Sequence, residues 1–188
     1  MPNAKTVKHL SMKELEAGLD EIKKSPKYKG ILEMIVCRPK KNEREVLKKG
    51  EISKEFGLIG DNWKTRGSSR TNDGFGHPEM QLNIMNARAI SLIAQEKDRW
   101  KLAGDQLYID IELSDENLPT GSKLKIGSAI IEITAIPHNG CKKFTERFGI
   151  DAVKFVNSPI GKELHLRGIN AKVLKAGTIS VGGIVEKL

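Results

Sequence analysis

The sequence predicts a mainly β fold, in which a small closed β-barrel carries peripheral α-helices. Apolar segments of strand length follow one another at close spacing, and glycines stand at the corners between them. Only two or three segments have helical spacing. Many short strands with glycine-rich turns are typical of barrels and sandwiches. Because 188 residues contain no internal repeat, low-complexity tract or linker, we expect one domain with a substantial core.

The composition is that of an ordinary globular protein rather than a disordered or membrane-embedded one. Hydrophobic residues make up 38% of the chain and charged residues 30%. No apolar run approaches the roughly 20 residues that a membrane helix requires. The first five residues lack the apolar core of a signal peptide, and two cysteines without such a signal argue against a disulfide framework. We therefore expect a cytoplasmic protein that does not contact a membrane.

The chain is basic, with 32 lysines and arginines against 24 acidic residues and a pI near 9.4. Such an excess favours anionic partners, but nucleic acid, a phosphate-bearing cofactor and simple solubility each account for it. The chain has only two Trp, two Tyr and five Phe, so an aromatic stacking platform for single-stranded nucleic acid is not expected.

The N-terminal part predicts a peripheral amphipathic helix followed by a strand. Ser11 and Glu14 have the spacing of a capping box, and apolar residues then follow at helical spacing as far as Ile22. Ser25-Pro26 ends the helix, and residues 30–38 form an apolar run typical of a buried strand. A partner-binding role for the helix is the alternative to a structural one.

Residues 64–79 are polar and contain almost no apolar side chain. A loop of this length inside a compact domain is usually functional or mobile. Its Arg66-Gly-Ser-Ser-Arg70 run could cradle a phosphate with two guanidinium groups and backbone N–H groups. A phosphate site and a flexible surface loop therefore remain as two interpretations.

Further elements follow from local patterns. Residues 45–49 and 80–85 predict strands, and Asn86 is placed to cap a helix over residues 87–97. In residues 105–113 apolar and polar side chains alternate, which predicts a strand with one apolar face. That face consists of Leu107, Ile109, Ile111 and Leu113.

The C-terminal half predicts a hairpin, two helices and closing strands. Gly127-Ser128 joins a strand ending at Ile126 to a return strand over residues 129–136. Residues 151–156 add one or two helical turns, and residues 169–185 contain short apolar strands with glycine corners.

Between these elements, Cys141 is placed to open a short helix. Phe144 and Phe148 lie four residues apart and share one helix face, and Gly149 is a suitable C-terminal stop. A thiol in the first helical turn meets unpaired N–H groups and the positive end of the helix dipole, which favour the thiolate.

The residues around Cys141 extend this chemical interpretation. Lys142 and Lys143 follow the thiol directly, and His138 precedes it in the same turn, where it either tunes the thiol or caps a backbone group. The alternative is a buried apolar filler, the usual role of an unpaired cysteine. Cys37 lies in an apolar strand-like run, and for it the filler interpretation holds.

Several kinds of site have no support in the sequence. There is no Walker loop and no dinucleotide-binding fingerprint, and the four histidines lack the spacing of a structural zinc site. A Cys–His pair of the protease type stays open, because the partners in such a pair are often distant in sequence.

The order of several short motifs resembles the MOSC domain family, named for the C-terminal portion of molybdenum cofactor sulfurases. The similarity covers roughly residues 30–187, and Cys141 stands at the place of the family's cysteine. Each motif is weak alone, but their order and spacing are specific. The motifs are Gly57 to Asp61, Gln81 to Ile84, Glu116 to Leu118, Lys123 to Thr134, Arg167 to Val173 and Gly177 to Ile179.

The resemblance implies a MOSC-like β-barrel over residues 30–188 and a link to molybdenum cofactor (Mo-molybdopterin), a phosphate-bearing pterin. It implies that Cys141 carries sulfur as a persulfide or ligates the metal. From its place in the same turn, we take His138 as the catalytic neighbour of Cys141. Anionic groups of the cofactor would be held by Arg167, Arg66 and Arg70. Asn117 and Asp61 would fix loops around the cofactor pocket.

Two features depart from the family pattern. Gly182-Gly183 stands where a glycine-aspartate pair is usual, either as a simple corner or as a weakened closure of the barrel. Residues 1–29 have no counterpart and are expected to form an N-terminal helical extension. Larger relatives add a pyridoxal-phosphate module, which this chain is too short to contain, so a cysteine desulfurase that donates sulfur would be a separate partner, as would a molybdoenzyme.

The first functional hypothesis is therefore a MOSC-domain protein that binds molybdenum cofactor, carries sulfur on Cys141 for its sulfuration, or does both. An alternative within the family is a cofactor-dependent reductase of N-hydroxylated compounds. Whether the protein is an enzyme, as a sulfur transferase or a molybdenum-dependent reductase, stays open. A basic barrel that binds nucleic acid is a third hypothesis, which the small number of aromatic residues disfavours.

Overall fold

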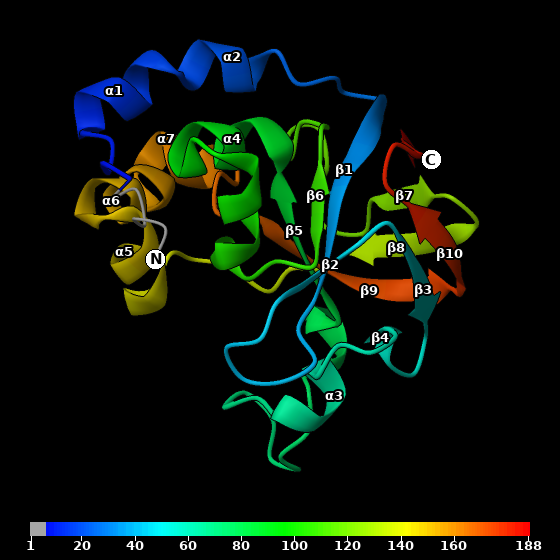
Figure 1. Ribbon diagram of the computed structural model, residues 1–188. Coiled ribbons are helices and arrows are strands. Elements are labelled where there is room, and N and C mark those ends of the chain that lie inside the picture. The colour runs from blue at the N-terminus through cyan, green and yellow to red at the C-terminus, as the bar shows by residue number, and fades with distance from the viewer. Residues whose placement is uncertain (1–6) are drawn as a thin grey trace.

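The structure is a computed structural model that describes residues 7–188, and its centre is a closed β-barrel (Figure 1). Neighbouring strands follow the order β11-β7-β8-β9-β5-β6-β1, and β1 also pairs with β11, which closes the barrel. The predicted fold class is confirmed. The strands are β1 (Lys29–Cys37), β5 (Leu82–Asn86), β6 (Leu107–Ile109), β7 (Lys123–Ile126), β8 (Ala129–Ile133), β9 (Ile169–Lys175) and β11 (Ile184–Lys187).

Four further strands extend this frame. β2 (Glu45–Leu47) pairs with the end of β1, and β3 (Lys49–Ser53) lies between β10 (Gly177–Ser180) and β4 (Gly57–Leu58) in a second, three-stranded sheet. The strand predicted over residues 45–49 is therefore two strands that pair with different partners. The chain leaves the barrel after β2 and enters the second sheet at Lys49.

Most helices gather on one flank of the barrel (Figure 1). They are α1 (Met12–Ala17), α2 (Leu19–Lys23), α4 (Ala87–Ala94), η2 (Lys97–Ala103), α5 (Lys142–Phe148), α6 (Ile150–Asn157) and α7 (Pro159–Glu163). The parallel pair β5–β6 requires a crossover connection, which α4 and η2 supply on this flank. None of the described helices is long and apolar enough to cross a membrane.

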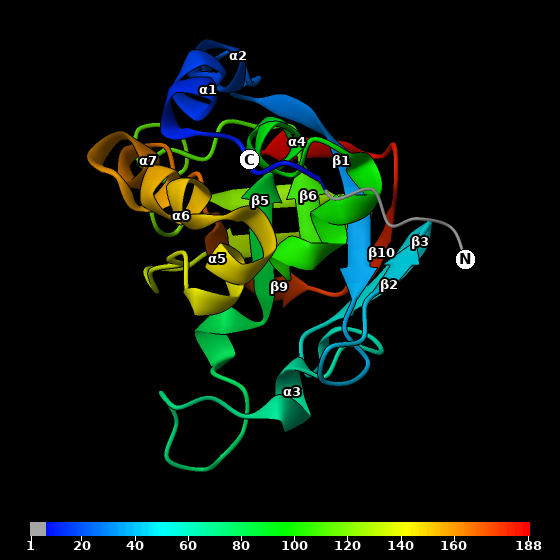
Figure 2. The ribbon, with the colours of Figure 1, turned by 60° about the vertical axis from the view of Figure 1, so that its left-hand side comes forward.

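Two short helices lie away from this flank. α3 (Trp63–Arg66) and η1 (Pro78–Met80) border the segment 67–77, which projects from the body of the molecule (Figure 2). The segment has no regular structure of its own, as expected for a long polar loop. Residues 1–6 lie outside the described residues. They include the first five residues, for which we expected no signal peptide.

Two hydrophobic cores share the strands β1, β5 and β6. Leu32, Ile84 and Ile109 point into the barrel, whereas Met34 and Tyr108 belong to the core between barrel and helices. The apolar face predicted for residues 105–113 is thus the barrel interior. The opposite face is also buried, because the helices cover it: Tyr108 is fully buried and its hydroxyl donates to the Trp100 carbonyl at 2.7 Å.

The predicted N-terminal helix is present but divided. Ser11 and Glu14 form the capping box, with the Glu14 carboxylate accepting from the Ser11 N–H at 2.8 Å. Gly18 then separates α1 from α2, at a point where a Cβ would lie 2.6 Å from Leu92. The segment packs on the helical flank, since Leu15 is fully buried and the Met12 N–H donates to Asp151 of α6 at 3.1 Å.

Glycine corners close the barrel as the sequence suggests. Gly127 has φ +56° in the turn between β7 and β8, a conformation that glycine adopts without strain. At the other seam, the Gly182 N–H donates to the Leu32 carbonyl at 2.8 Å, and the Leu32 N–H donates to the Gly183 carbonyl at 2.9 Å. The Gly182-Gly183 pair is therefore a corner whose backbone itself bonds to β1, and the closure does not depend on a carboxylate there.

Asn86 offers a direct test of this packing. Its side chain caps α4 by accepting from the Ala89 N–H at 2.9 Å, and its amide donates to Ser25 and to the buried Ile111 carbonyl. We expect Asn86→Ala to lower the free energy of unfolding by about 2–4 kcal/mol, because a cap is lost and a buried acceptor is left unpaired. The exposed cap variant Ser11→Ala should lose about 1 kcal/mol or less in the same urea titration. Equal losses would contradict this account.

Candidate functional site

Cys141 lies where the sequence places it, at the N-cap of α5, and its side chain is exposed. The turn before it is fixed to α6: the Gly140 N–H donates to Asn157 Oδ1 at 2.9 Å, and Asn157 Nδ2 donates back to the Gly140 carbonyl at 3.1 Å. A Cβ at Gly140 would lie 2.8 Å from Val153, so this close approach requires glycine. The thiol is thus presented to solvent by a turn that is held in place.

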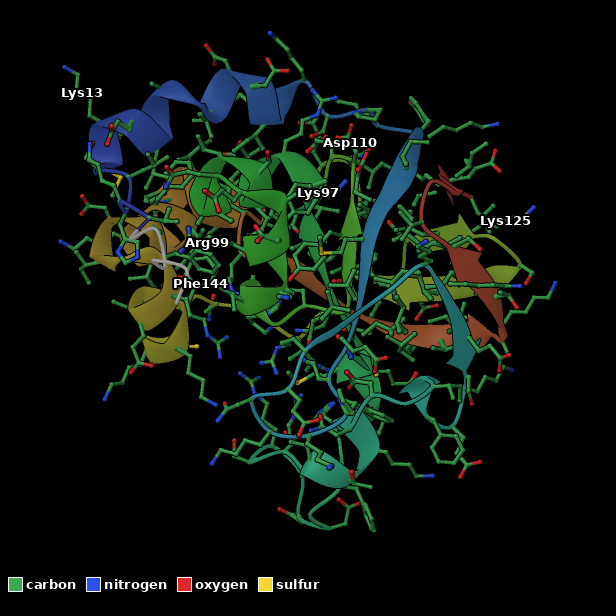
Figure 3. All side chains as sticks on the ribbon, viewed as in Figure 1. Lys13, Lys97, Arg99, Asp110, Lys125 and Phe144 are labelled. Atoms are coloured by element: carbon green, nitrogen blue, oxygen red, sulfur yellow. The ribbon has the colours of Figure 1, made fainter. Side chains whose placement is uncertain are left out.

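The helix behind the thiol is anchored by its aromatic face. Phe144 and Phe148 are buried, with ring centroids 4.8 Å apart, as their spacing predicts. Phe144 and Arg99 of η2 lie at the same junction between helices (Figure 3), where the Arg99 guanidinium lies 5.5 Å from the Phe148 ring and donates to the Arg147 carbonyl. These contacts fix the axis of α5 and hence the position of its first residue.

The second cysteine shows the opposite environment. Cys37 is 4% exposed within the barrel core, and burial, followed by Asp61 and Glu45, raises the pKa of its thiol to about 11. Such a thiol stays protonated and inert at neutral pH. The interpretation of Cys37 as a core filler therefore agrees with its position.

A buried polar cluster lies beneath the turn that carries Cys141. Arg167 donates to Asp105 Oδ2 at 2.7 Å and to the Ala103 carbonyl at 2.9 Å, and its guanidinium lies 5.0 Å from the Phe144 ring. His138 Nδ1 lies 3.4 Å from Asp105 Oδ1, but the two atoms are not aligned for a hydrogen bond. As a result, His138 Nδ1, Asp105 Oδ1 and Arg167 Nε are buried without a partner among the described residues.

Burial controls the protonation of this cluster. Burial lowers the pKa of His138 well below its usual value, and the nearby charges of Arg167 and Arg38 lower it further. Burial also raises the pKa of Asp105, while the ion pair with Arg167 opposes this shift. His138 is therefore neutral at pH 7, so it would act on a neighbouring group through a hydrogen bond rather than through charge.

Two cavities flank His138. One, of about 370 Å³, is lined by His138, Asn139, Lys162 and Arg167 among others. The other, of about 310 Å³, lies along residues 133–138. His165 borders both cavities in a left-handed conformation (φ +48°), which is unusual for a residue other than glycine, and its Nε2 lies 2.9 Å from Asp115. Space for a ligand thus exists beside the turn that carries Cys141.

A second polar centre lies at the end of β1, where Arg38 is buried. Its Nε and Nη2 donate to the two carboxylate oxygens of Asp61 at 2.8 and 2.9 Å. Its Nη1 donates to Asn83 Oδ1 at 3.1 Å and to the Gly104 carbonyl at 2.9 Å. The Asp61 side chain is fully buried and also accepts from the Trp63 N–H at 2.9 Å. The predicted role of Asp61 in fixing a loop agrees with these contacts.

Amide side chains connect this ion pair to the turn that carries Cys141. Asn83 Nδ2 donates to Asn170 Oδ1 at 2.5 Å, and Asn170 Nδ2 donates to the Ile136 carbonyl at 2.9 Å. Gln106 accepts from the Asn83 N–H at 2.7 Å. The network therefore runs from the end of β1 across β5 and β9 to the residue before Pro137.

Three further arginines surround the Arg38–Asp61 pair. Arg44 and Arg147 both lie close to Gly104, since a Cβ there would lie 3.7 Å from Arg44 Nη2 and 3.8 Å from Arg147 Nη1. Arg66 ends α3; although the residue is exposed overall, partial desolvation of its guanidinium and the charge of Arg38 lower its pKa to about 10. This end of the barrel is strongly positive.

Not every residue implied by the family resemblance joins these centres. Arg70 is exposed in the projecting loop, and no contact with the two centres is found for it among the described residues. That loop uses its own N–H groups in turns, including Arg70 N–H to Ser68 Oγ at 3.1 Å. Asn117 lies at the opposite end of the barrel, where it donates to the Lys27 carbonyl just before β1. A role for Arg70 or Asn117 in the same pocket is therefore not supported by their positions.

The sequence analysis missed four residues that these centres contain. Arg38 follows an apolar strand without a break, and a charged residue in that place is the one available signal of a buried ion pair. Asp105 opens the alternating segment 105–113, but no local feature indicates its pairing with an arginine 62 positions away. Arg44 and Arg147 stand in mixed-charge segments, which usually predict a solvated surface.

The two thiols should differ sharply in accessibility. In the native protein we expect one equivalent of a thiol reagent such as DTNB to react within minutes at pH 8, at Cys141, because Cys37 is buried and protonated. Cys141→Ser should react only after unfolding in guanidinium chloride, and the wild type should then show two reactive thiols. Reaction of both thiols at one rate in the native protein would contradict the structure.

Comparison with known proteins agrees with this architecture. The family model of the MOSC domain matches residues 72–186. Among solved structures, the YuaD protein from Bacillus subtilis is similar at a TM-score of 0.64 and 16% identity, over 85% of this chain and 95% of that one. YiiM from Escherichia coli is similar at 0.53 and 19% identity, over 84% and 69%. YiiM from Geobacillus stearothermophilus is similar at 0.57 and 12% identity, over 85% and 75%.

The solved structures bear on the fold, and the family model identifies the family. A comparison with curated protein sequences gives no significant match. The family model covers more than half of the chain, and its range includes the hairpin, the turn with Cys141 and the closing strands. The protein therefore belongs to the MOSC domain family.

Proposed function

We propose that this protein binds molybdenum cofactor and that Cys141 carries sulfur for its sulfuration as a persulfide. The observation that carries the proposal is an exposed thiol on a fixed turn whose preceding residues, Pro137 to Asn139, line a cavity together with Arg167. Membership of the MOSC family supplies the link to the cofactor. The expected cytoplasmic location suits a thiol that must stay reduced until it receives sulfur.

The residues present fit such a cofactor. Among residues 7–188, no group of three His, Cys, Asp or Glu side chains could hold a metal ion, so the protein would add at most one thiolate to a metal that the pterin already holds. When bound, the cofactor supplies a metal centre that takes up sulfur. His138, Lys162 and Arg167 line the cavity and are suited to hydrogen-bond polar groups of the pterin, and the arginine-rich end of the barrel suits its phosphate.

The loading of Cys141 with sulfur is a persulfide exchange that needs no reductant. The Cys141 thiolate attacks the outer sulfur of a persulfide on a donor protein, and a new S–S bond forms. The S–S bond of the donor breaks, and its electron pair leaves with the donor thiolate. Exposure of Cys141 allows contact with such a donor, which we take to be a separate cysteine desulfurase.

His138 would position the sulfur rather than exchange a proton with solvent. The imidazole is partly buried and neutral, and it lies three residues before Cys141 in the same turn. A neutral imidazole can donate one hydrogen bond to a sulfur anion without adding a positive charge. This role is a proposal about orientation, and Cys141 remains the group that reacts.

Mass spectrometry and metal analysis of protein from cofactor-producing cells test the proposal. We expect intact wild-type protein to show a fraction that is heavier by one sulfur atom, a mass lost on treatment with dithiothreitol. Cys141→Ser should lack this fraction entirely. Cys37→Ala, the control in which the buried thiol is removed, should keep it.

Three results would contradict the proposal. A Cys141→Ser variant that retains both sulfur and molybdenum would exclude Cys141 as the carrier. Sulfur lost equally in Cys37→Ala would exclude a role specific to the exposed thiol. Stoichiometric molybdenum without persulfide would favour the reductase of N-hydroxylated compounds in place of the carrier.

A further inference from the structure

We propose that the protein has a second binding site, which takes a small organic cation with a primary ammonium group on an aromatic or apolar body. The site is a cavity of about 440 Å³ between the N-terminal helices and the helical flank of the barrel. Its walls come from α2, β1, α4, η2 and the residue after β6, and pockets of this size hold small molecules. Neither Cys141 nor His138 lines it, so the site is separate from the one proposed above.

Part of this cavity lies outside the region that defines the family. α2 and Glu33 of β1 precede residues 72–186, which the family model matches. α2 also belongs to the N-terminal segment that has no counterpart in the family motifs. The cavity therefore exists only where this segment packs on the barrel domain.

One part of the lining is apolar. It consists of the side chains of Ile22, Ala87, Leu92 and Trp100. Trp100 is only 6% exposed, and its ring packs against the buried Tyr108 ring with 5.9 Å between centroids, so the indole is held in place. A fixed indole beside aliphatic side chains suits an apolar body, and the face of its ring attracts a cation.

The charged part of the lining is predominantly acidic. It contains the carboxylates of Glu21, Glu33 and Asp110 and one cation, Arg88. Arg88 is already engaged, because its Nε and Nη2 donate to the two oxygens of Asp110 at 2.8 and 3.1 Å. Its Nη1 also donates to the Glu21 carbonyl at 3.3 Å, which ties α4 to α2. An excess of carboxylates in a chain of net charge +8 favours a positively charged ligand at this place.

A lysine shows how an ammonium group is held beside this cavity. Lys97 Nζ donates to Glu33 Oε2 at 2.8 Å and lies 5.1 Å from the centroid of the Trp100 ring. Both partners line the cavity, whereas Lys97 itself does not; Lys97 and Asp110 lie below α2 in the view of Figure 3. A carboxylate and an aromatic face are the groups that recognise organic ammonium ions. The Lys97 ammonium thus occupies the position that the ammonium of a ligand would take.

A ligand can replace Lys97 at a small cost. The Lys97 side chain is 57% exposed, and an exposed ion pair contributes little to stability. A ligand ammonium would make the same two contacts, and its apolar body would in addition leave water for the apolar lining. Glu21 is a less suitable partner, because it is exposed and already pairs with Lys24 at 3.0 Å. Glu33 and Trp100 are therefore the residues that recognise the cation.

Isothermal titration calorimetry with 2-phenylethylamine tests this site, with 3-phenylpropionate as an anion of similar size. At pH 7 we expect the wild-type protein to bind the amine and to show no measurable binding of the carboxylate. Glu33→Gln should weaken binding of the amine about tenfold, because a hydrogen bond to a charged group is lost. Lys97→Ala should instead tighten it about twofold to fivefold, because the competing ammonium is removed.

Glu132→Gln is the matched control. Glu132 is also a half-buried strand glutamate that pairs with a lysine, Lys172, at 3.1 Å, but it does not line the cavity. This variant should bind the amine as the wild type does. The inference would be overturned by no binding of the amine, by equal binding of amine and carboxylate, by equal losses in Glu33→Gln and Glu132→Gln, or by weaker binding in Lys97→Ala. Cys141→Ser should bind the amine normally, so failure of sulfur transfer at Cys141 would leave this result unchanged.

Discussion

The structure depends on one buried ion pair, Arg38–Asp61, at the end of the barrel. Burying two charges carries a large desolvation penalty, which is offset only when the geometry is good and the other polar atoms are satisfied. Here the guanidinium makes four hydrogen bonds, and the carboxylate accepts backbone N–H groups in addition to the arginine. These contacts join four segments: β1, the turn after β4, β5 and the segment before β6. Breaking any one of them would leave a buried polar group unpaired, so the four segments keep one arrangement.

The same ion pair is hydrogen-bonded to the turn that carries Cys141. Arg38 donates to Asn83, Asn83 donates to Asn170, and Asn170 donates to the Ile136 carbonyl just before that turn. By neutralising Arg38, Asp61 reduces the charge repulsion between Arg38 and the nearby Arg44 and Arg66. The same fold thus separates two thiols chemically: Cys37 is buried one residue before the ion pair, and Cys141 is exposed on a fixed turn.

Much of the architecture could be predicted from local sequence. The capping box at Ser11, the cap at Asn86, the glycine turn at Gly127 and the helix after Cys141 all follow from residues close in sequence, and the structure has each of them. The burial of Tyr108 could not be predicted, because a period of two says which residues share a face but not whether helices cover it. The order of motifs likewise indicated a common site for Asn117 and Asp61, which the barrel places at opposite ends.

Arg38, Arg44, Arg147 and Asp105 could not be predicted for a related reason. Their partners lie tens of positions away, and a charged residue in isolation most often belongs to a solvated face. Arg38 meets Asp61 and Gly104, and Arg147 comes close to Arg44, only when the barrel has closed. Long-range pairing, rather than local propensity, therefore specifies the candidate site.

A double-mutant cycle on Arg38 and Asp61 tests the central claim most directly. Asp61→Asn keeps the size of the side chain and one acceptor oxygen but strands a buried guanidinium, so it should lower the free energy of unfolding by about 3–5 kcal/mol. In the Arg38→Met background the same substitution should cost at least about 2 kcal/mol less, because no buried charge is left unpaired. If Asp61→Asn costs the same in both backgrounds, the ion pair does not organise this end of the barrel.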